Sequence, residues 1–204
     1  MSTRSADAGS SRRKVLLSLL VVAIVAVATG TGTYAAFSGT TANPGNAFAA
    51  GTVTIADNDA GGSLLSLSNA RPGDSSTGCI KITYSGSLNA NVHLYGSSTG
   101  SLPSYLTLTV TRGTDSSPSF ASCGSFSADS TNYIGSGPGV IYSGTLSAFP
   151  STYGGGIVDP TSGSPATWST SDAHSYKFVV SLQNNASAQG LSSTASFTWE
   201  ARNT

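Results

Sequence analysis

The stretch LTLTVT, residues 106–111, decides the fold class of this chain. Its apolar residues Leu106, Leu108 and Val110 alternate with threonines, and this period of two places the two kinds of side chain on opposite faces of a β-strand. Threonine suits a solvated strand face, whereas leucine and valine suit a face that packs on a core. The stretch therefore predicts a strand with one buried face.

The same alternation recurs after residue 50. Further strands are predicted at residues 79–84 (CIKITY), 176–182 (YKFVVSL) and 194–200 (TASFTWE), with shorter ones at 50–55, 64–67, 91–95 and 140–143. Gly, Pro and Asp residues separate these runs and indicate turns. No convincing helix longer than a turn or two follows residue 30, and residues 146–149 are the best short candidate. The pattern predicts an all-β fold, a jelly-roll-like β-sandwich of two sheets.

Composition limits the kinds of partner. Only 9% of the 204 residues are charged, and the formal net charge is zero. After Ala35 the sequence has five Lys and Arg residues against eight Asp and Glu residues, a net charge of 5 − 8 = −3. It therefore lacks the basic patch that neutralises phosphates, and we expect no nucleic-acid partner.

The N-terminal residues have the three parts of an export signal. A basic RRK (residues 12–14) precedes an apolar run at residues 15–28, and small residues follow it. Thr33 and Ala35 occupy the −3 and −1 positions of a cut after Ala35, which would start the mature chain at Ala36. We predict a cleaved signal peptide at residues 1–35 and a single β-sandwich domain at residues 36–204. The protein is then expected to be secreted, extracellular or at the cell surface, with membrane contact only before cleavage.

Two alternatives for this segment stay open. The apolar run is shorter than the ~20 residues of a membrane span, although extension through Phe37 could make it an uncleaved anchor. The string SRRKVL (residues 11–16) is similar to a twin-arginine signal, but the strongly apolar run favours the general secretory route.

Cys79 and Cys123 are the only two cysteines. In an exported chain such a pair predicts a disulfide, with two free buried thiols as the alternative. In the chain-entropy model, a bond across 44 positions stabilises by roughly 4 kcal/mol. The bond would hold residues 114–138, the stretch with the weakest strand pattern, against the strand that begins at Cys79.

The sequence contains no recognisable catalytic centre. His93 and His174 lie far apart, Glu200 is the only glutamate, and no His-Glu-x-x-His string is present. We therefore expect no catalytic, cofactor-binding or metal-binding residue and no enzymatic activity. A histidine pair assembled across strands with an aspartate, or a Ser-His-Asp triad, could be excluded only by geometry.

Several motifs resemble the TasA/camelysin family of bacterial secreted proteins. At the N-terminus they resemble its SipW-dependent type of signal peptide and mature start: RKVLL (13–17), GTYAAFS (32–38) and NAFAAGTV (46–53). Further on, RPGD (71–74), the strand at 79–84 and SGSLNANV (85–92) resemble a turn-strand-turn element of the family. Residues 176–182, 189–190 and 196–201 are similar to its two closing strands. The resemblance is vague between about residues 97 and 170.

The resemblance implies a dedicated signal peptidase, a jelly-roll domain, and export to the cell surface or the biofilm matrix. Members of the TasA kind polymerise into matrix fibres, in which the freed N-terminal segment adds as a strand to the next subunit. Residues 36–55 are nearly uncharged and suit addition to a sheet edge, so we expect a homo-oligomer or fibre. The apolar residues of this self-association segment are Phe37, Phe48, Val53 and Ile55.

Three alternatives to strand donation in a fibre remain. The segment could fold back as an ordinary edge strand of its own chain. The protein could be a monomeric surface-binding module, whose mark would be a concave sheet face lined with Trp168, Tyr or Phe side chains. Camelysin-like members are described as metallo-endopeptidases, but the ligand set for that activity is missing, and we do not carry it over.

Overall fold

The computed structural model describes residues 50–204, which form one compact unit. Ala35, Ala36, Phe37 and Phe48 lie outside the described residues, as does the predicted signal peptide. Within residues 50–204, none of the helices has the length and hydropathy that crossing a membrane requires.

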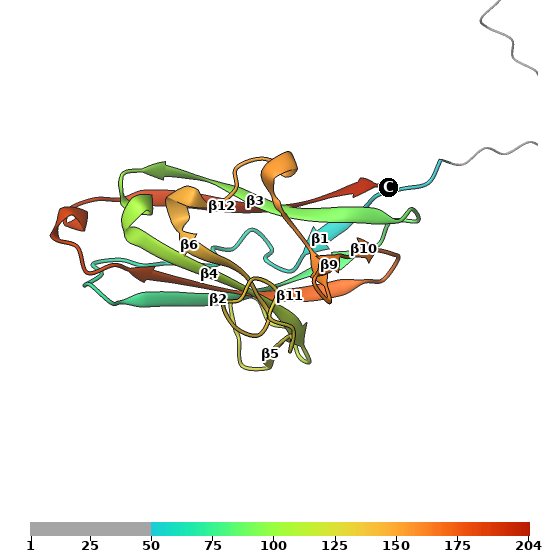
Figure 1. Ribbon diagram of the computed structural model, residues 1–204, viewed down its shortest axis with the longest axis horizontal. Helices are drawn as coiled ribbons and strands as arrows, with labels where there is room; N and C mark the ends of the chain where they lie inside the picture. Colours follow the sequence, from blue (N-terminus) through green and yellow to red (C-terminus); the bar gives the residue numbers. More distant parts are fainter. Residues whose placement is uncertain (1–49) are drawn as a thin grey trace, which may run out of the picture. The chain divides into compact units, whose positions relative to one another are not determined.

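The described residues fold as an all-β sandwich of two antiparallel sheets, as the sequence predicts (Figure 1). The first sheet has the order β1-β2-β11-β4-β5, and β6 also pairs with β4. Its strands are β1 (Ile55–Asp57), β2 (Ser75–Tyr84), β4 (Leu106–Asp115), β5 (Phe126–Ala128), β6 (Val140–Thr145) and β11 (Ala173–Leu182). We call this sheet A. Neighbouring strands within it come from distant parts of the sequence, as in jelly-roll-like sandwiches.

The second sheet, sheet B, has the order β10-β3-β12, and β7 also pairs with β3. Its strands are β3 (Ala90–Gly100), β7 (Ile157–Val158), β10 (Thr167–Trp168) and β12 (Ser193–Asn203). A separate hairpin joins β8 (Pro160–Thr161) and β9 (Ser164–Pro165). Short 3-10 helices at η2 (Leu102–Tyr105), η3 (Leu146–Ala148), η4 (Tyr153–Gly155) and η5 (Ala186–Ala188) connect the strands.

The core lies between the sheets and follows from the alternating pattern. In sheet A, Phe178 of β11 is opposite Val110 of β4, and Val180 is opposite Leu108. These four side chains are buried, whereas Val179, between Phe178 and Val180, is only partly buried on the outer face. Burial of such side chains at about 25 cal/mol per Å² is the main term that stabilises a sandwich of this kind.

The RPGD motif forms the turn that leads into β2. The Asp74 backbone N–H donates to the Arg71 carbonyl at 2.9 Å, and Gly73 has φ of +90°. Proline second and a left-handed glycine third are what a type II turn requires. The Leu182 N–H donates to the Asp74 carbonyl at 3.0 Å, which fixes the turn beside the end of β11.

Two of the shorter strand predictions are wrong. Residues 64–67 form no strand. The Ser66 N–H donates to the hydroxyl of Ser76 in β2 at 3.2 Å, so this segment lies beside β2 without a backbone ladder. Of residues 50–55 only Ile55 is in a strand. The short helical segment predicted at residues 146–149 is present as η3.

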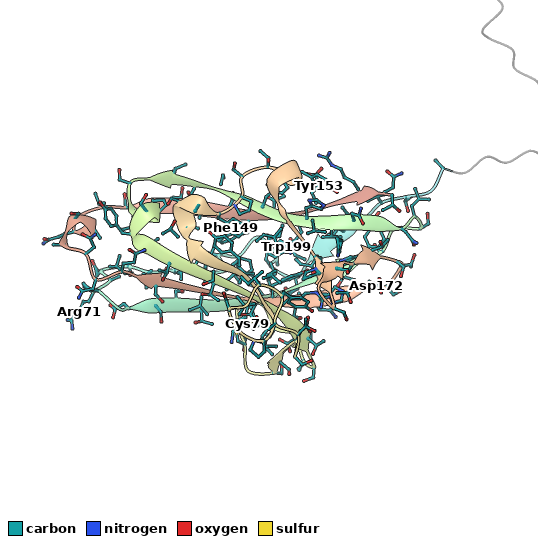
Figure 2. All side chains as sticks on the ribbon, viewed as in Figure 1. Arg71, Cys79, Phe149, Tyr153, Asp172 and Trp199 are labelled. Atoms are coloured by element: carbon teal, nitrogen blue, oxygen red, sulfur yellow. A yellow bond between two sulfur atoms is a disulfide. The ribbon has the colours of Figure 1, made fainter. Side chains whose placement is uncertain are left out.

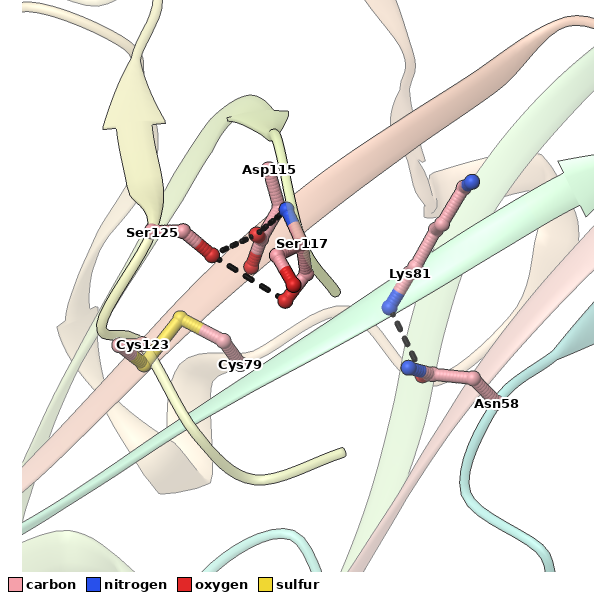
Figure 3. Close-up of a disulfide and its surroundings, with 7 residues drawn as sticks. All are labelled: Asn58, Cys79, Lys81, Asp115, Ser117, Cys123 and Ser125. Carbon is pink, nitrogen blue, oxygen red and sulfur yellow. Dashed lines mark hydrogen bonds between the residues drawn. A yellow bond between two sulfur atoms is a disulfide. The ribbon is translucent and has the colours of Figure 1, made fainter. Parts of the chain in front are cut away.

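A disulfide joins Cys79 and Cys123, with 5.2 Å between their Cα atoms, as the sequence analysis expects. Cys79 lies on the outer side of β2 and is 2% exposed. The bond attaches the segment between β4 and β5 to the outer face of sheet A (Figure 3).

Candidate functional site

A buried charged cluster lies at one end of the core, centred on Arg112. Arg112 is in β4 at the position that follows Leu106, Leu108 and Val110 on the inward face, and it is 7% exposed. Its Nε donates to Asp159 Oδ1 at 2.8 Å and its Nη2 to Asp159 Oδ2 at 3.3 Å. Its Nη1 also donates to Asp129. Burial alone would lower the pKa of Arg112, but the two carboxylates raise it, so the guanidinium stays charged.

Asp159 links the two sheets. It is 3% exposed and accepts hydrogen bonds from Tyr176 Oη at 2.6 Å and from Trp168 Nε1 at 2.9 Å. Tyr176 and Arg112 belong to sheet A, whereas Trp168 belongs to sheet B, and the Asp159 N–H donates to the Val92 carbonyl of β3 at 2.9 Å. Burial, followed by the nearby Asp159 charge, raises the pKa of Tyr176 well above its ordinary value. Both carboxylate oxygens are therefore occupied by donors from within the chain.

His174 completes the cluster. Its ring nitrogens lie 3.1 and 3.0 Å from Arg112 Nη2, and Nε2 is 3.8 Å from Asp159 Oδ2. Burial is the largest cause that lowers the pKa of His174; the Asp159 charge opposes it and the Arg112 charge adds to it. A neutral imidazole offers one acceptor nitrogen to the guanidinium, whereas an imidazolium offers none. The site therefore favours neutral His174.

This arrangement predicts a loss of stability in mild acid. The folded pKa of His174 lies below its ordinary value of about 6.5, so the unfolded chain binds the proton more readily. The contribution of neutral His174 to the free energy of unfolding is therefore fully present above pH 6.5. It falls as the pH drops below 6.5 toward the lower pKa of the folded protein. We expect the free energy of unfolding, measured with urea between pH 8 and pH 5, to decline less steeply in His174→Gln than in the wild type. Equal slopes in the two proteins would contradict this assignment.

His93 lies on the outer face of sheet B, apart from this cluster. Its ring stacks on Tyr153 with 4.0 Å between ring centroids, and its Nδ1 is 2.8 Å from the Tyr153 carbonyl. Arg202 covers the Tyr153 ring at 3.8 Å and pairs with Glu200 at 2.8 Å. Figure 2 shows Tyr153 on the outside of this sheet. These contacts attach η4 to the sheet.

The two histidines do not provide a metal site in the part of the chain that the structure describes. Within residues 50–204, no group of three or more His, Cys, Asp or Glu side chains is placed to hold a metal ion. Both nitrogens of His174 face a guanidinium, and Asp159 is already bound by Arg112, Tyr176 and Trp168. A cation placed there would have to displace a permanently charged Arg112.

The most accessible backbone of the sandwich is the edge of sheet B. β12 pairs with β3 through eleven residue pairs, from Ser193–Gly100 to Asn203–Ala90. Within residues 50–204, no backbone or side-chain group bonds to the other edge of β12. The strand has no proline, and Glu200 and Arg202 are its only charged residues. Prolines, lysines and bulges are the usual protection of an edge strand, so this edge suits the addition of another strand.

A small pocket of mixed polarity lies between this edge and β1. Its volume is about 180 Å³, and it is lined by Ile55, Ala56, Asp57, Ile82, Phe197, Thr198 and Trp199. Figure 2 shows Trp199 between the two layers, where its ring packs on Phe178 and Tyr176. Its indole Nε1 is buried and has no hydrogen-bond partner within residues 50–204.

Of the predicted self-association residues, Val53 and Ile55 lie in the described part of the chain, and only Ile55 is at this pocket. Ile55 is in β1, pairs with Tyr84 of β2 and lines the pocket. Val53 precedes the strand and is 37% exposed. Trp168 is fully buried and bound to Asp159, so it cannot line an open binding face as the surface-module alternative required.

Sequence reasoning did not identify Arg112 or the open edge. The alternation in LTLTV places Arg112 on the inward face of the strand, and a buried charge requires a buried partner. This position could have identified Arg112 from the sequence. The edge carried no local signal, because which strand lies at an edge depends on pairing between distant segments.

The comparison with known families agrees with the sequence resemblance. Residues 10–99 match the family described as camelysin metallo-endopeptidase, which confirms the resemblance to the TasA/camelysin family. No curated protein matches the chain.

Proposed function

We propose that this protein is an exported structural protein that self-associates at the cell surface or in the biofilm matrix by β-strand addition. The match of residues 10–99 to the camelysin family supports this proposal. The donor is residues 36–49 of the predicted segment, freed when a signal peptidase cuts after Ala35, because Ile55 is already paired within its own chain. The acceptor is β12 of the next copy. The uncovered edge of β12, beside a pocket that Phe197 and Trp199 line, is the observation that carries this proposal.

The acceptor has the two parts that strand addition uses. Backbone groups along β12 give affinity, and a pocket for an inward side chain gives specificity. Phe197 and Trp199 are the inward residues of β12 at the pocket, and both pack on Phe178. A phenylalanine of an added strand would extend this aromatic cluster, and the donor segment offers Phe37 and Phe48.

β1 is compatible with this role. It pairs with β2 over only three residues, Ile55 to Asp57, so the donor segment precedes it. Addition in trans therefore leaves β1 in place.

Electron microscopy and light scattering of a chain that begins at Ala36 test the proposal. We expect filaments that lengthen with time, and none from a chain that begins at Ala50, which keeps every described strand but loses the donor. Circular dichroism of both chains controls for folding. Equal lengthening of the two would contradict donation by residues 36–49.

A matched pair of substitutions tests the acceptor. Thr198→Lys puts a charge on the open edge strand and should strongly slow lengthening. Thr107→Lys makes the same change at an exposed position of β4, which has neighbours on both sides, and should leave lengthening unchanged. Equal effects would place the acceptor elsewhere.

Peptidase activity is the second candidate, and the description of the matched family is what favours it. Zinc-dependent cleavage of a peptide by the chain that begins at Ala36, abolished by a chelator, would support this candidate.

A further inference from the structure

The sandwich has two long strands near its edges, β2 and β12, and they differ in how their edges are covered. β2 has ten residues and β12 has eleven. β1 pairs only with Ile82 to Tyr84 of β2, which leaves the residues before Ile82 without a neighbouring strand on that side. By strand pairing alone, β2 would be a second acceptor edge.

Loops cover this part of β2. The Lys81 N–H donates to Asn58 Oδ1 at 3.0 Å, and the Cys79 carbonyl accepts from the Ala121 N–H at 2.9 Å. Figure 3 shows Asn58 at the backbone of Lys81 and Cys123 bonded to Cys79 on the same strand. Two of the backbone groups that an added strand would use here, the Lys81 N–H and the Cys79 carbonyl, are therefore already bonded.

The disulfide and two polar contacts hold the covering loop in place. Cys123, which follows Ala121 by two residues, forms the disulfide with Cys79. At the base of the loop, Asp115 Oδ1 accepts from the Ser117 N–H at 3.0 Å and from the Ser125 hydroxyl. Phe120 lies within the covering loop, and its ring packs against Gly62, which follows Asn58 in the neighbouring loop. This contact joins the two loops.

We propose that the Cys79–Cys123 disulfide closes the edge of β2, so that of the two long strands only β12 is open to strand addition. This inference rests on the proposed function, and the occupant it concerns is the segment at residues 36–49 of a second copy. One donor and one acceptor in each chain give a linear, unbranched polymer. A second acceptor edge would allow branches and lateral bundles.

The test uses chains that begin at Ala36. In Cys79→Ser/Cys123→Ser, we expect the Ala121 amide hydrogen, which donates to the Cys79 carbonyl in the wild type, to exchange at least tenfold faster in dispersed monomers. On assembly the edge-facing amides at positions 77 and 79 should become protected, and electron microscopy should show branched or bundled filaments. Ser122→Ala, an exposed change in the same loop that keeps the disulfide, is the control and should match the wild type.

Asn58→Ala is a second variant for the case in which the double variant does not fold. It removes only the acceptor of the Lys81 N–H and should speed exchange at that amide while the disulfide remains. The proposal is overturned if the double variant forms the same unbranched filaments as the wild type, or if exchange at the Ala121 amide is unchanged. Absence of filaments from every variant would count against strand addition itself, whereas monomer exchange still decides whether the disulfide closes this edge.

Discussion

Replacing Arg112 with alanine is expected to lower the free energy of unfolding by about 3–5 kcal/mol, because it leaves buried Asp159 without its opposite charge. Asp159 would keep the Tyr176 and Trp168 hydrogen bonds but lose both bonds from the guanidinium. Asp129 would lose the same partner. A loss of this size is a large fraction of the stability of a typical domain, about 5–15 kcal/mol. Urea unfolding followed by tryptophan fluorescence measures it.

Arg202→Ala is the matched control. Arg202 also pairs with a carboxylate at 2.8 Å, that of Glu200, but its side chain is 58% exposed. Solvent screens exposed pairs and they contribute little to stability, so this variant should unfold close to the wild type. Arg112→Lys should fall between the two, because an ammonium keeps the charge and cannot reproduce the two-pronged bond. Equal losses for Arg112→Ala and Arg202→Ala would contradict the central role of the cluster.

The sequence predicted the strands far better than it predicted their neighbours. The alternation in LTLTVT and YKFVVSL identified which side chains face the core, because that periodicity is local. That β11 lies between β2 and β4 follows from contacts among three distant segments, which no local pattern encodes. The segment at residues 64–67 is apolar enough to predict a strand, yet its Ser66 N–H donates to the Ser76 hydroxyl and no backbone ladder forms.

Because local patterns do not encode contacts between distant segments, only part of the candidate site could be predicted. The disulfide could be predicted, because a chain with two cysteines allows only one intramolecular pairing. The open edge of β12 could not, because its sequence resembles that of the paired strands. Arg112 could have been inferred from its inward position, but its partner Asp159 lies 47 residues away in an irregular segment.

The second large effect is expected at Phe178, where truncation to alanine should cost about 3–5 kcal/mol. Phe178 is fully buried opposite Val110 and contacts the rings of Phe197 and Trp199. Its removal would leave a cavity between the sheets, because the backbone ladders on both sides of β11 prevent collapse. Thermal unfolding and urea unfolding of the same variant measure the loss.

Val179→Ala is the matched control for Phe178→Ala. Val179 is the next residue of the same strand, and its side chain points to the outer face. A shift of one residue in the pairing of β11 would exchange the two positions and reverse the two effects. A small loss for Val179→Ala, under about 1 kcal/mol, beside a large one for Phe178→Ala would support the register between β11 and β4. Comparable losses would mean that the two sheets do not meet at this face of β11, and the positions of Arg112, Trp199 and the pocket beside β12 would change with it.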